Sequence, residues 1–133
     1  MGKKVVYTYV VADLFHIGHL KHLLRAKKLG DYLIVGVLTD KATMEKKPKP
    51  IILFNERKKL IKSLCCVDEV VKQDTYSPLS NIKKIKPDIL MESDSHKEMP
   101  ANEFVKSYGG KVIISPYYKK QSSTKIKQKI RNE

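Results

Sequence analysis

The sequence predicts an α/β fold with three layers, in which a five-stranded parallel sheet lies between helices. β-prone apolar runs alternate along the chain with segments of helical periodicity, and this alternation implies right-handed crossovers between parallel strands. The first run is almost continuously apolar, which is typical of a strand covered on both faces. A length of 133 residues fits one domain, so we expect a single domain over residues 1–133.

Five β-prone runs are the expected strands of this sheet. They cover residues 5–11, 32–38, 68–71, 89–91 and 111–115. In open parallel sheets, ligands bind beyond the carboxyl ends of the strands. The candidate site is therefore made of the segments that follow four of the strands, residues 12–19, 39–47, 92–97 and 116–124.

Apolar residues at helical spacing predict helices between the strands. Leu20, Leu23 and Leu24 form the first apolar face, and Gly30 ends that helix. Residues 41–50 are polar and contain two prolines, so we expect a loop there. The later helices are expected to begin at Asn55, at Ser77-Pro78, at Pro100 and at Ser122-Ser123-Thr124.

The composition restricts the class of protein and its partners. A net charge of +13 favours anionic partners such as phosphorylated molecules, nucleic acid or anionic lipid, although lysines that only solvate the surface explain part of it. No apolar run approaches the ~20 residues of a membrane span, and the first residues lack a signal-peptide pattern. Cys65 and Cys66 are adjacent and suit neither a disulfide nor a zinc site, so we expect a cytoplasmic location.

The segment His16-Ile17-Gly18-His19 carries the strongest chemical signal. It lies where the first strand gives way to the first helix, and a helix N-terminus attracts phosphate. Gly18 allows close approach to the backbone, and the spacing of three lets both imidazoles face one ligand. Two imidazoles can donate to phosphate oxygens that gain charge in a transition state. The alternatives are a helix cap beside a surface histidine, and a zinc site that lacks a third ligand.

Several segments, in order along the chain, resemble one family of enzymes. Residues 9–19 and 122–127 are similar to the two signatures of the cytidylyltransferase-like nucleotidyltransferases, with the glycerol-3-phosphate cytidylyltransferases as the nearest branch. Residues 30–35, 56–58, 67–70 and 87–89 resemble the same family. The similarity covers nearly the whole chain, which makes it far more specific than one tetrapeptide.

The resemblance implies a Rossmann-like fold and transfer of a nucleoside monophosphate, CMP by preference, to a small phosphorylated or phosphonate acceptor, with release of pyrophosphate. It implies CTP, or ATP as the second possibility, together with Mg²⁺ and a homodimer. His16 and His19 would stabilise the attacked α-phosphate. The alternative is an adenylyltransferase of the same superfamily, of the FMN or phosphopantetheine type. A basic nucleic-acid-binding module would explain the charge but would leave the histidine motif unused.

The resemblance also assigns roles to a lysine and an arginine. Lys46, with Lys47 as the alternative, would reach the triphosphate or the acceptor phosphate, unless it is a solvated loop lysine. Arg57 would lie near the phosphates, where a guanidinium suits phosphate better than an ammonium does. The competing interpretation of Arg57 is an ion pair on a helix surface.

The remaining candidates would bind the nucleotide. They are Val11, Ala12, Asp13, Gly18, Asp94, Ser122, Ser123 and Thr124. The hydroxyls that open the last helix could hold the β- and γ-phosphates, whereas plain capping would explain only one of them. For the two aspartates, capping of a loop is an equal alternative to contact with the nucleotide, the acceptor or Mg²⁺. No metal-ligand set can be assigned from the sequence.

Three segments depart from the family pattern. Residues 10–13 lack the glycine, hydroxyl and aromatic residue that precede the histidines in the relatives, and residues 92–95 replace Gly-Asp-Asp-Trp, which leaves Glu92 where the relatives carry glycine. The arginine before the Ser/Thr cluster is missing, and Lys119 or Lys120 would replace its charge. These departures affect the identity of the base and the acceptor more than the class of reaction.

Overall fold

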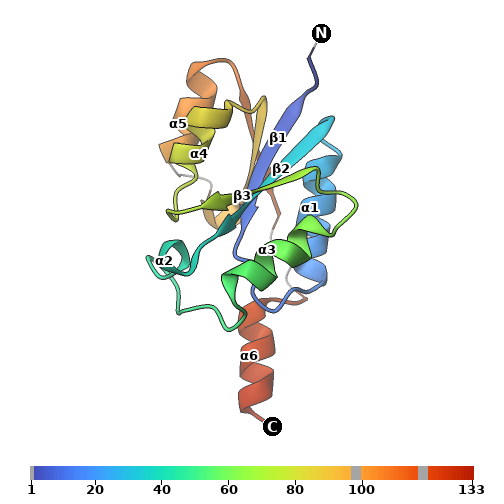
Figure 1. Cartoon of the computed structure of the whole chain (residues 1–133), viewed down its shortest axis with the longest axis vertical. Helices are drawn as coiled ribbons and strands as arrows, with labels where there is room; N and C mark the ends of the chain where they lie inside the picture. The colour runs from blue at the N-terminus through green and yellow to red at the C-terminus, as the bar shows by residue number, and fades with distance from the viewer. Residues whose placement is uncertain (1, 97–99, 117–119) are drawn as a thin grey trace.

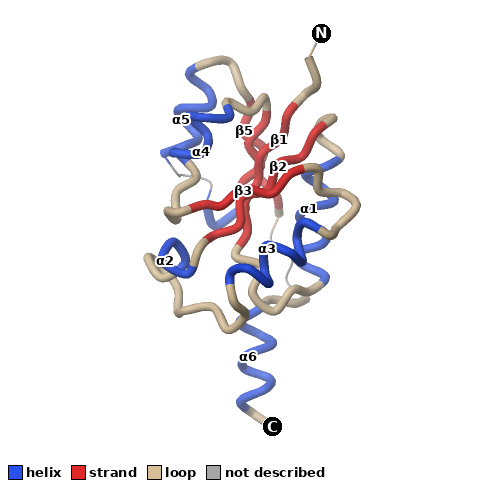
Figure 2. Tube along the Cα trace, viewed as in Figure 1, coloured by secondary structure: helices blue, strands red, loops and turns tan. Residues whose placement is uncertain are grey.

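The computed structural model describes residues 2–96, 100–116 and 120–133. In this part of the chain a parallel sheet of five strands has the order β3-β2-β1-β4-β5 (Figures 1 and 2). The strands are β1 (Val5–Val10), β2 (Tyr32–Leu38), β3 (Glu69–Gln73), β4 (Ile89–Ser93) and β5 (Lys111–Ser115). From β1 the chain first builds outward to β3 and then returns to β4 on the other side, so the strand order reverses between β1 and β4, where open sheets bind ligands.

Helices cover both faces of the sheet. Their bounds are α1 (Ile17–Lys27), α2 (Asp40–Thr43), α3 (Phe54–Lys62), α4 (Leu79–Ile85), α5 (Pro100–Ser107) and α6 (Ser123–Arg131), with a 3₁₀ turn η1 (Asp94–His96). α1 and α3 lie on one face, and α4 and α5 lie on the other (Figure 1). The three-layer α/β class expected from the sequence is confirmed.

Strand β1 shows why its sequence is almost continuously apolar. Val6 packs with Leu23 and Ile61 on the face covered by α1 and α3. Tyr7 packs with Ile82 on the opposite face. Successive side chains of a strand point to opposite faces, and both faces are buried here. Each fully buried Leu or Ile stabilises the fold by roughly 1.5–3 kcal/mol.

The structure corrects several expected boundaries. β2 has the expected bounds, whereas β1 ends one residue earlier because Ala12 turns into the left-handed region with φ 61°. The segment expected to be a loop contains α2, which begins where the Thr39 side chain accepts from the backbone N–H of Ala42. α3 begins at Phe54 rather than after Asn55, and no side chain caps it. The sequence pattern predicted most of the strands and helices, and the observed bounds differ from the expected ones by a few residues at their ends.

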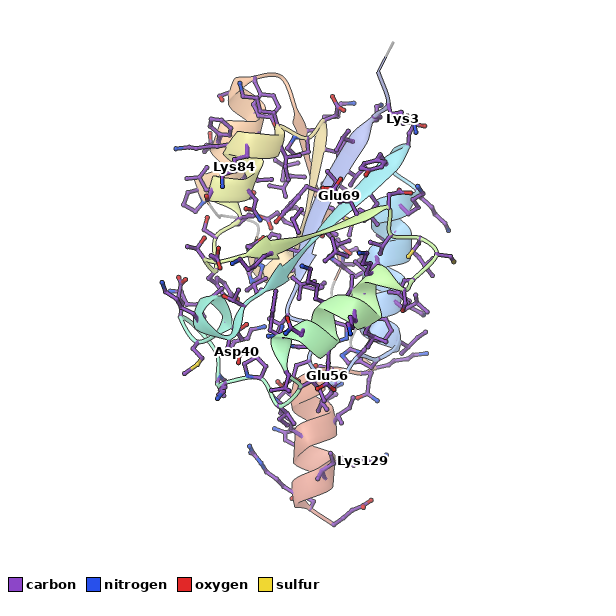
Figure 3. All side chains as sticks on the ribbon, viewed as in Figure 1. Lys3, Asp40, Glu56, Glu69, Lys84 and Lys129 are labelled. Atoms are coloured by element: carbon purple, nitrogen blue, oxygen red, sulfur yellow. The ribbon has the colours of Figure 1, made fainter. Side chains whose placement is uncertain are left out.

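α6 differs from the other helices in its packing. None of its residues is buried, and it extends away from the body of the domain, with Lys129 on its free part (Figures 1 and 3). Each helix in the described ranges is too short or too polar to cross a bilayer. α6 is therefore attached to the domain mainly through its first turns, which lie beside the pocket described below.

Candidate active site

A cavity of about 730 Å³ opens at the carboxyl ends of the strands. This volume is in the range of small-molecule and cofactor sites. Residues from every candidate segment line it. Among them are Val11, Asp13, His16, Gly18, His19, Lys47, Ser93, His96, Ser122, Ser123, Thr124 and Lys127. We call this cavity the pocket.

The two histidines of the motif are fixed at the N-terminus of α1. His16 is the N-cap, and its Nδ1 accepts from the Gly18 backbone N–H at 2.9 Å. His19 Nδ1 accepts from the His16 backbone N–H at 3.2 Å, so the two residues form a reciprocal capping box. Their ring centroids are 4.1 Å apart. The capping role that the sequence left open is therefore real, and it coexists with a place on the pocket wall.

The same bonds determine which nitrogen carries the proton. Burial lowers the pKa of His16, and burial together with the neighbouring histidines and Lys47 lowers the pKa of His19 to about 3. Both rings are thus neutral at neutral pH. Because each Nδ1 accepts a hydrogen bond, the proton of each neutral ring is on Nε2. The capping box therefore leaves two Nε2–H donors that are not used by it.

A third histidine continues the row along α1. His22 Nε2 lies 2.7 Å from the Thr8 hydroxyl, which donates to the Met91 carbonyl at 2.9 Å. Since the single hydroxyl proton is used by Met91, His22 must donate through Nε2. Burial, with Arg25 and His96, lowers the pKa of His22 to about 4. His22 lines the pocket and is held to the sheet by its contact with Thr8.

Asp13 holds together the segments around the pocket. Its two carboxylate oxygens accept from the backbone N–H groups of Ile51 and Ile52 at 3.0 and 2.9 Å. The Lys127 ammonium of α6 lies 3.2 Å from Oδ2. Burial would raise the pKa of Asp13, but the two backbone donors and Lys127 outweigh it and lower the pKa. Of the two roles that the sequence left open for Asp13, capping of a loop fits these contacts.

The three hydroxyl residues at the start of α6 have different roles. Ser122 is the N-cap, and its Oγ accepts from the Lys125 backbone N–H at 3.0 Å. The Ser123 hydroxyl donates to the Asp13 carbonyl, which joins α6 to the β1–α1 loop. Thr124 also lines the pocket. The helix N-terminus therefore faces the same space as the histidine pair, an arrangement suited to phosphate.

The two adjacent loop lysines occupy different positions. Both side chains are exposed overall, but Lys47 lines the pocket and Lys46 lies outside its lining. Although the Lys47 side chain is exposed overall, partial desolvation of its ammonium by the surrounding pocket wall, and then the charge of Lys127, lower the pKa of Lys47. The structure thus places the alternative residue, Lys47, at the site rather than Lys46.

The expectation for Arg57 needs correction. Its side chain is completely buried and does not line the pocket. The guanidinium donates to the carbonyls of Ile52, Val11 and Leu38 at 3.0, 2.7 and 2.7 Å. Its remaining branch forms an ion pair at 2.7 Å with Asp40 at the start of α2; Figure 3 labels Asp40. With four of its five N–H donors occupied by these groups, Arg57 fixes the ends of β1 and β2 beneath the site instead of lining the pocket.

Other candidates also lie off the pocket wall. Ala12 is buried, and Asp94 in η1 is exposed; neither lines the pocket. Lys120 is exposed and outside the lining, and Lys119 lies outside the described residues. Asp94 was expected near the nucleotide because the family carries an aspartate there, but η1 leaves its side chain facing solvent.

One end of the pocket is aromatic. His96 lies in the candidate segment 92–97 and Tyr9 begins the segment that resembles the family, whereas no signal in the sequence marked Tyr76. His96 Nε2 lies 2.6 Å from the Tyr76 hydroxyl, and His96 Nδ1 lies 3.2 Å from the Tyr9 hydroxyl. The Tyr9 and His96 rings are stacked, with centroids 5.6 Å apart. All three line the pocket.

The charge of the lining favours a ligand with several negative groups. Five lysines and arginines line the pocket: Lys21, Arg25, Lys47, Lys127 and Arg131. Asp13 is the one acidic side chain in the described lining, and it is already paired. Among the described residues, no three His, Cys, Asp or Glu side chains come together as a metal site. The zinc interpretation of the histidine pair therefore finds no support in these ranges.

Comparison with known proteins identifies the family. The family model described as cytidylyltransferase-like matches residues 8–129. The chain belongs to this family. Its membership supports the coarse expectation of a nucleotidyltransferase.

The individual relatives give a finer picture. The chain is 35% identical to the bifunctional protein HldE of Syntrophotalea carbinolica and 37% identical to that of Citrifermentans bemidjiense, each match covering 97% of the chain and 27% of the relative. The chain thus spans about a quarter of the length of these relatives. A lipopolysaccharide core biosynthesis protein from Thermoplasma volcanium has a similar structure, with TM-score 0.75, 30% identity and coverage of 90% of this chain and all of that one.

A more distant structure shares the fold alone. The pantoate-β-alanine ligase of Francisella tularensis matches with TM-score 0.62 at 15% identity, over 97% of this chain and 69% of the ligase. This match agrees with the Rossmann-like arrangement expected from the resemblance.

Proposed function

We propose that the chain transfers an adenylyl group from ATP to a small phosphorylated acceptor and releases pyrophosphate. The HldE relatives favour adenylyl over cytidylyl transfer, so ATP replaces the CTP expected from the sequence. The name of the Thermoplasma protein favours a phosphorylated building block of a surface saccharide as the acceptor. The observation that carries the proposal is the pair of neutral Nε2–H donors facing the same pocket as the N-terminus of α6.

The reaction needs no nucleophile from the protein. An oxygen of the acceptor phosphate attacks the α-phosphorus of ATP, a new P–O bond forms, and the bond to the β-phosphate breaks so that pyrophosphate leaves with the electron pair. Nε2–H groups of His16 and His19 would donate to the α-phosphate oxygens as their charge grows. Preorganised donors of this kind lower the barrier without having to reorient during the step.

The leaving pyrophosphate would be held on the opposite side of the histidine pair. Lys47 and the first turn of α6 supply an ammonium and free backbone N–H groups in the same pocket. Mg²⁺ remains an expectation from the family. The described residues provide no preformed cage for it, and the Asp13 oxygens are already engaged, so we assign it no ligand from the protein.

The test is a pyrophosphate-release assay of the whole chain. ATP, CTP, GTP and UTP are each combined with sugar 1-phosphates, glycerol 3-phosphate, phosphonates, FMN and phosphopantetheine. The expected result is release that requires both substrates, is fastest with ATP and falls at least about 100-fold in His16→Ala. Lys46→Ala, at an exposed loop lysine, is the matched control and should retain activity. Preference for CTP would restore the cytidylyl assignment, and no release with any pair would refute the proposal.

A further inference from the structure

Glu92 is a buried carboxyl that the proposed reaction does not use. It follows Met91 in β4, its side chain has no exposure to solvent, and neither carboxyl oxygen has a hydrogen-bond partner among the described residues. Buried charged groups are normally paired, because desolvation without a partner is costly. Burial accordingly raises the pKa of Glu92 to about 7, and the nearby Tyr9 hydroxyl opposes this rise only in part, since it does not reach hydrogen-bond geometry with either oxygen.

The sheet places this carboxyl beside the aromatic end of the pocket. β1 and β4 pair in parallel, with Tyr7 opposite Leu90, and the same register two residues further on brings Tyr9 beside Glu92. Burial, and then the charge of Glu92, raise the pKa of Tyr9, and the same two causes in the same order raise the pKa of Tyr76. Glu92 is therefore electrostatically coupled to both tyrosines that flank His96.

The hydrogen bonds of His96 can run in only two directions. Burial, together with Lys47, lowers the pKa of His96, so its ring is neutral and carries one proton. One ring nitrogen must donate and the other must accept. The hydroxyls of Tyr9 and Tyr76 lie on opposite nitrogens of this ring, so the direction of one bond determines the direction of the other.

We propose that Glu92 is a positioning residue that determines, through Tyr9 and His96, whether the Tyr76 hydroxyl donates to or accepts from a ligand in the pocket. The inference rests on the proposed function for the identity of that ligand, the phosphorylated acceptor. The coupling of Glu92, Tyr9, His96 and Tyr76 is a property of the free protein and does not depend on the proposed function.

The two arrangements follow from counting protons. When Glu92 is ionised, the Tyr9 hydroxyl turns to its carboxylate and forms a new hydrogen bond that the structure does not yet contain. His96 Nδ1–H then donates to the Tyr9 oxygen, and the Tyr76 hydroxyl donates to Nε2. When Glu92 is protonated, Tyr9 donates to Nδ1 and Nε2–H donates to the Tyr76 oxygen. In this second arrangement the Tyr76 proton is free to donate into the pocket.

The groups around Glu92 leave it as the one that titrates near neutral pH. Tyr7 and Tyr9 face it from β1, Tyr76 from the segment before α4, and His96 from η1, with Lys47 acting on His96. The pKa values of the tyrosines are raised above their ordinary value and that of His96 is lowered below its own, so each moves away from neutral pH while that of Glu92 moves toward it. Asn102 of α5, which packs against β4, is polar but uncharged.

Protonated Glu92 is the form suited to an anionic acceptor. It provides a hydroxyl donor at Tyr76 and removes a negative charge from beneath the pocket. Raising the pH through 7 reverses both effects, so the affinity for the acceptor should fall. Glu92→Gln fixes the chain in a state that resembles the protonated form, since the amide N–H can donate to the Tyr9 oxygen.

The direct test is the tautomer of His96, observed in long-range proton–nitrogen NMR spectra of the free protein. The expected result is a change from Nε2–H at pH 6 to Nδ1–H at pH 8 in the wild type, and Nε2–H at both values in Glu92→Gln. Glu69→Gln, on β3 (Figure 3), is the matched control because Glu69 accepts from the Tyr32 hydroxyl on an exposed edge. It should behave as the wild type. A single tautomer throughout in the wild type would overturn the inference.

Kinetics then test the effect on the acceptor. The ratio of acceptor KM values, wild type over Glu92→Gln, should rise about tenfold between pH 6 and pH 8 for a group with a pKa of about 7, while kcat stays similar. Ionisation of the substrate affects the KM of both proteins equally, so its effect cancels in the ratio. A flat ratio alongside a switching tautomer refutes the link to the acceptor. If no acceptor reacts at all, the proposed function fails and the NMR result still decides the role of Glu92.

Discussion

Replacing Glu92 with glutamine should stabilise the fold in a way that depends on pH. Burial raises the pKa of Glu92 from 4.5 to about 7 in the folded chain, so the folded state holds this proton more tightly than the unfolded state. The contribution of this proton to the free energy of unfolding is fully present below pH 4.5 and is lost as the pH rises to about 7. Each pH unit in that window corresponds to about 1.4 kcal/mol, which gives a total of about 3 kcal/mol.

Urea unfolding of wild type and Glu92→Gln at pH 4.5 and pH 8 measures this difference. The change between the two pH values isolates ionisation, because the cost of burying an amide is the same at both. From pH 4.5 to pH 8, the free energy of unfolding of the variant should rise by about 3 kcal/mol relative to that of the wild type. Glu69→Gln should gain little, since an exposed carboxyl is well solvated. If the free energy of unfolding changes with pH by the same amount in wild type and Glu92→Gln, ionisation of Glu92 does not destabilise the fold, which contradicts this prediction.

Three further predictions concern the other residues of the site. Lys47→Ala should lower kcat/KM at least tenfold in the pyrophosphate assay, whereas Lys46→Ala should leave it unchanged; equal losses would contradict the placement of the pocket. The ring protons of His19 should not titrate between pH 5 and 8 in NMR spectra of the free protein, because its pKa is about 3; a midpoint near 6.5 would refute the neutral-donor argument. Arg57→Lys should cost about 3–5 kcal/mol in urea unfolding, since an ammonium cannot make the same bonds and leaves Asp40 unpaired; a stable variant would show that the buried fork is dispensable.

The layers and the histidine pair could be predicted because their signals are local. β2 occupies the expected residues, since a continuous apolar run between turn residues is visible in the sequence alone. The histidine pair depends on two features that the sequence also carries, a strand–helix junction and a spacing of three. Both lie within ten residues of each other along the chain.

The errors concern contacts between distant segments. Nothing near Arg57 in the sequence indicates that Val11 and Leu38 end beside it with unpaired carbonyls, which is why burial was missed. Lys46 and Lys47 differ only in where the turn after α2 points them. Tyr9 and Tyr76 meet His96 through the order of the strands, which propensity does not specify.

The way α6 is attached has a consequence for measured affinities. The helix buries no residue and is held at its first turns by Ser123 and Lys127, both of which contact Asp13. Segments with so little packing open at low free energy compared with the core. A ligand that binds at the start of α6 therefore also suppresses fraying of the helix, and part of its binding energy goes into ordering the backbone. A dissociation constant will understate the strength of the contacts themselves, and hydrogen exchange along α6 will report the difference.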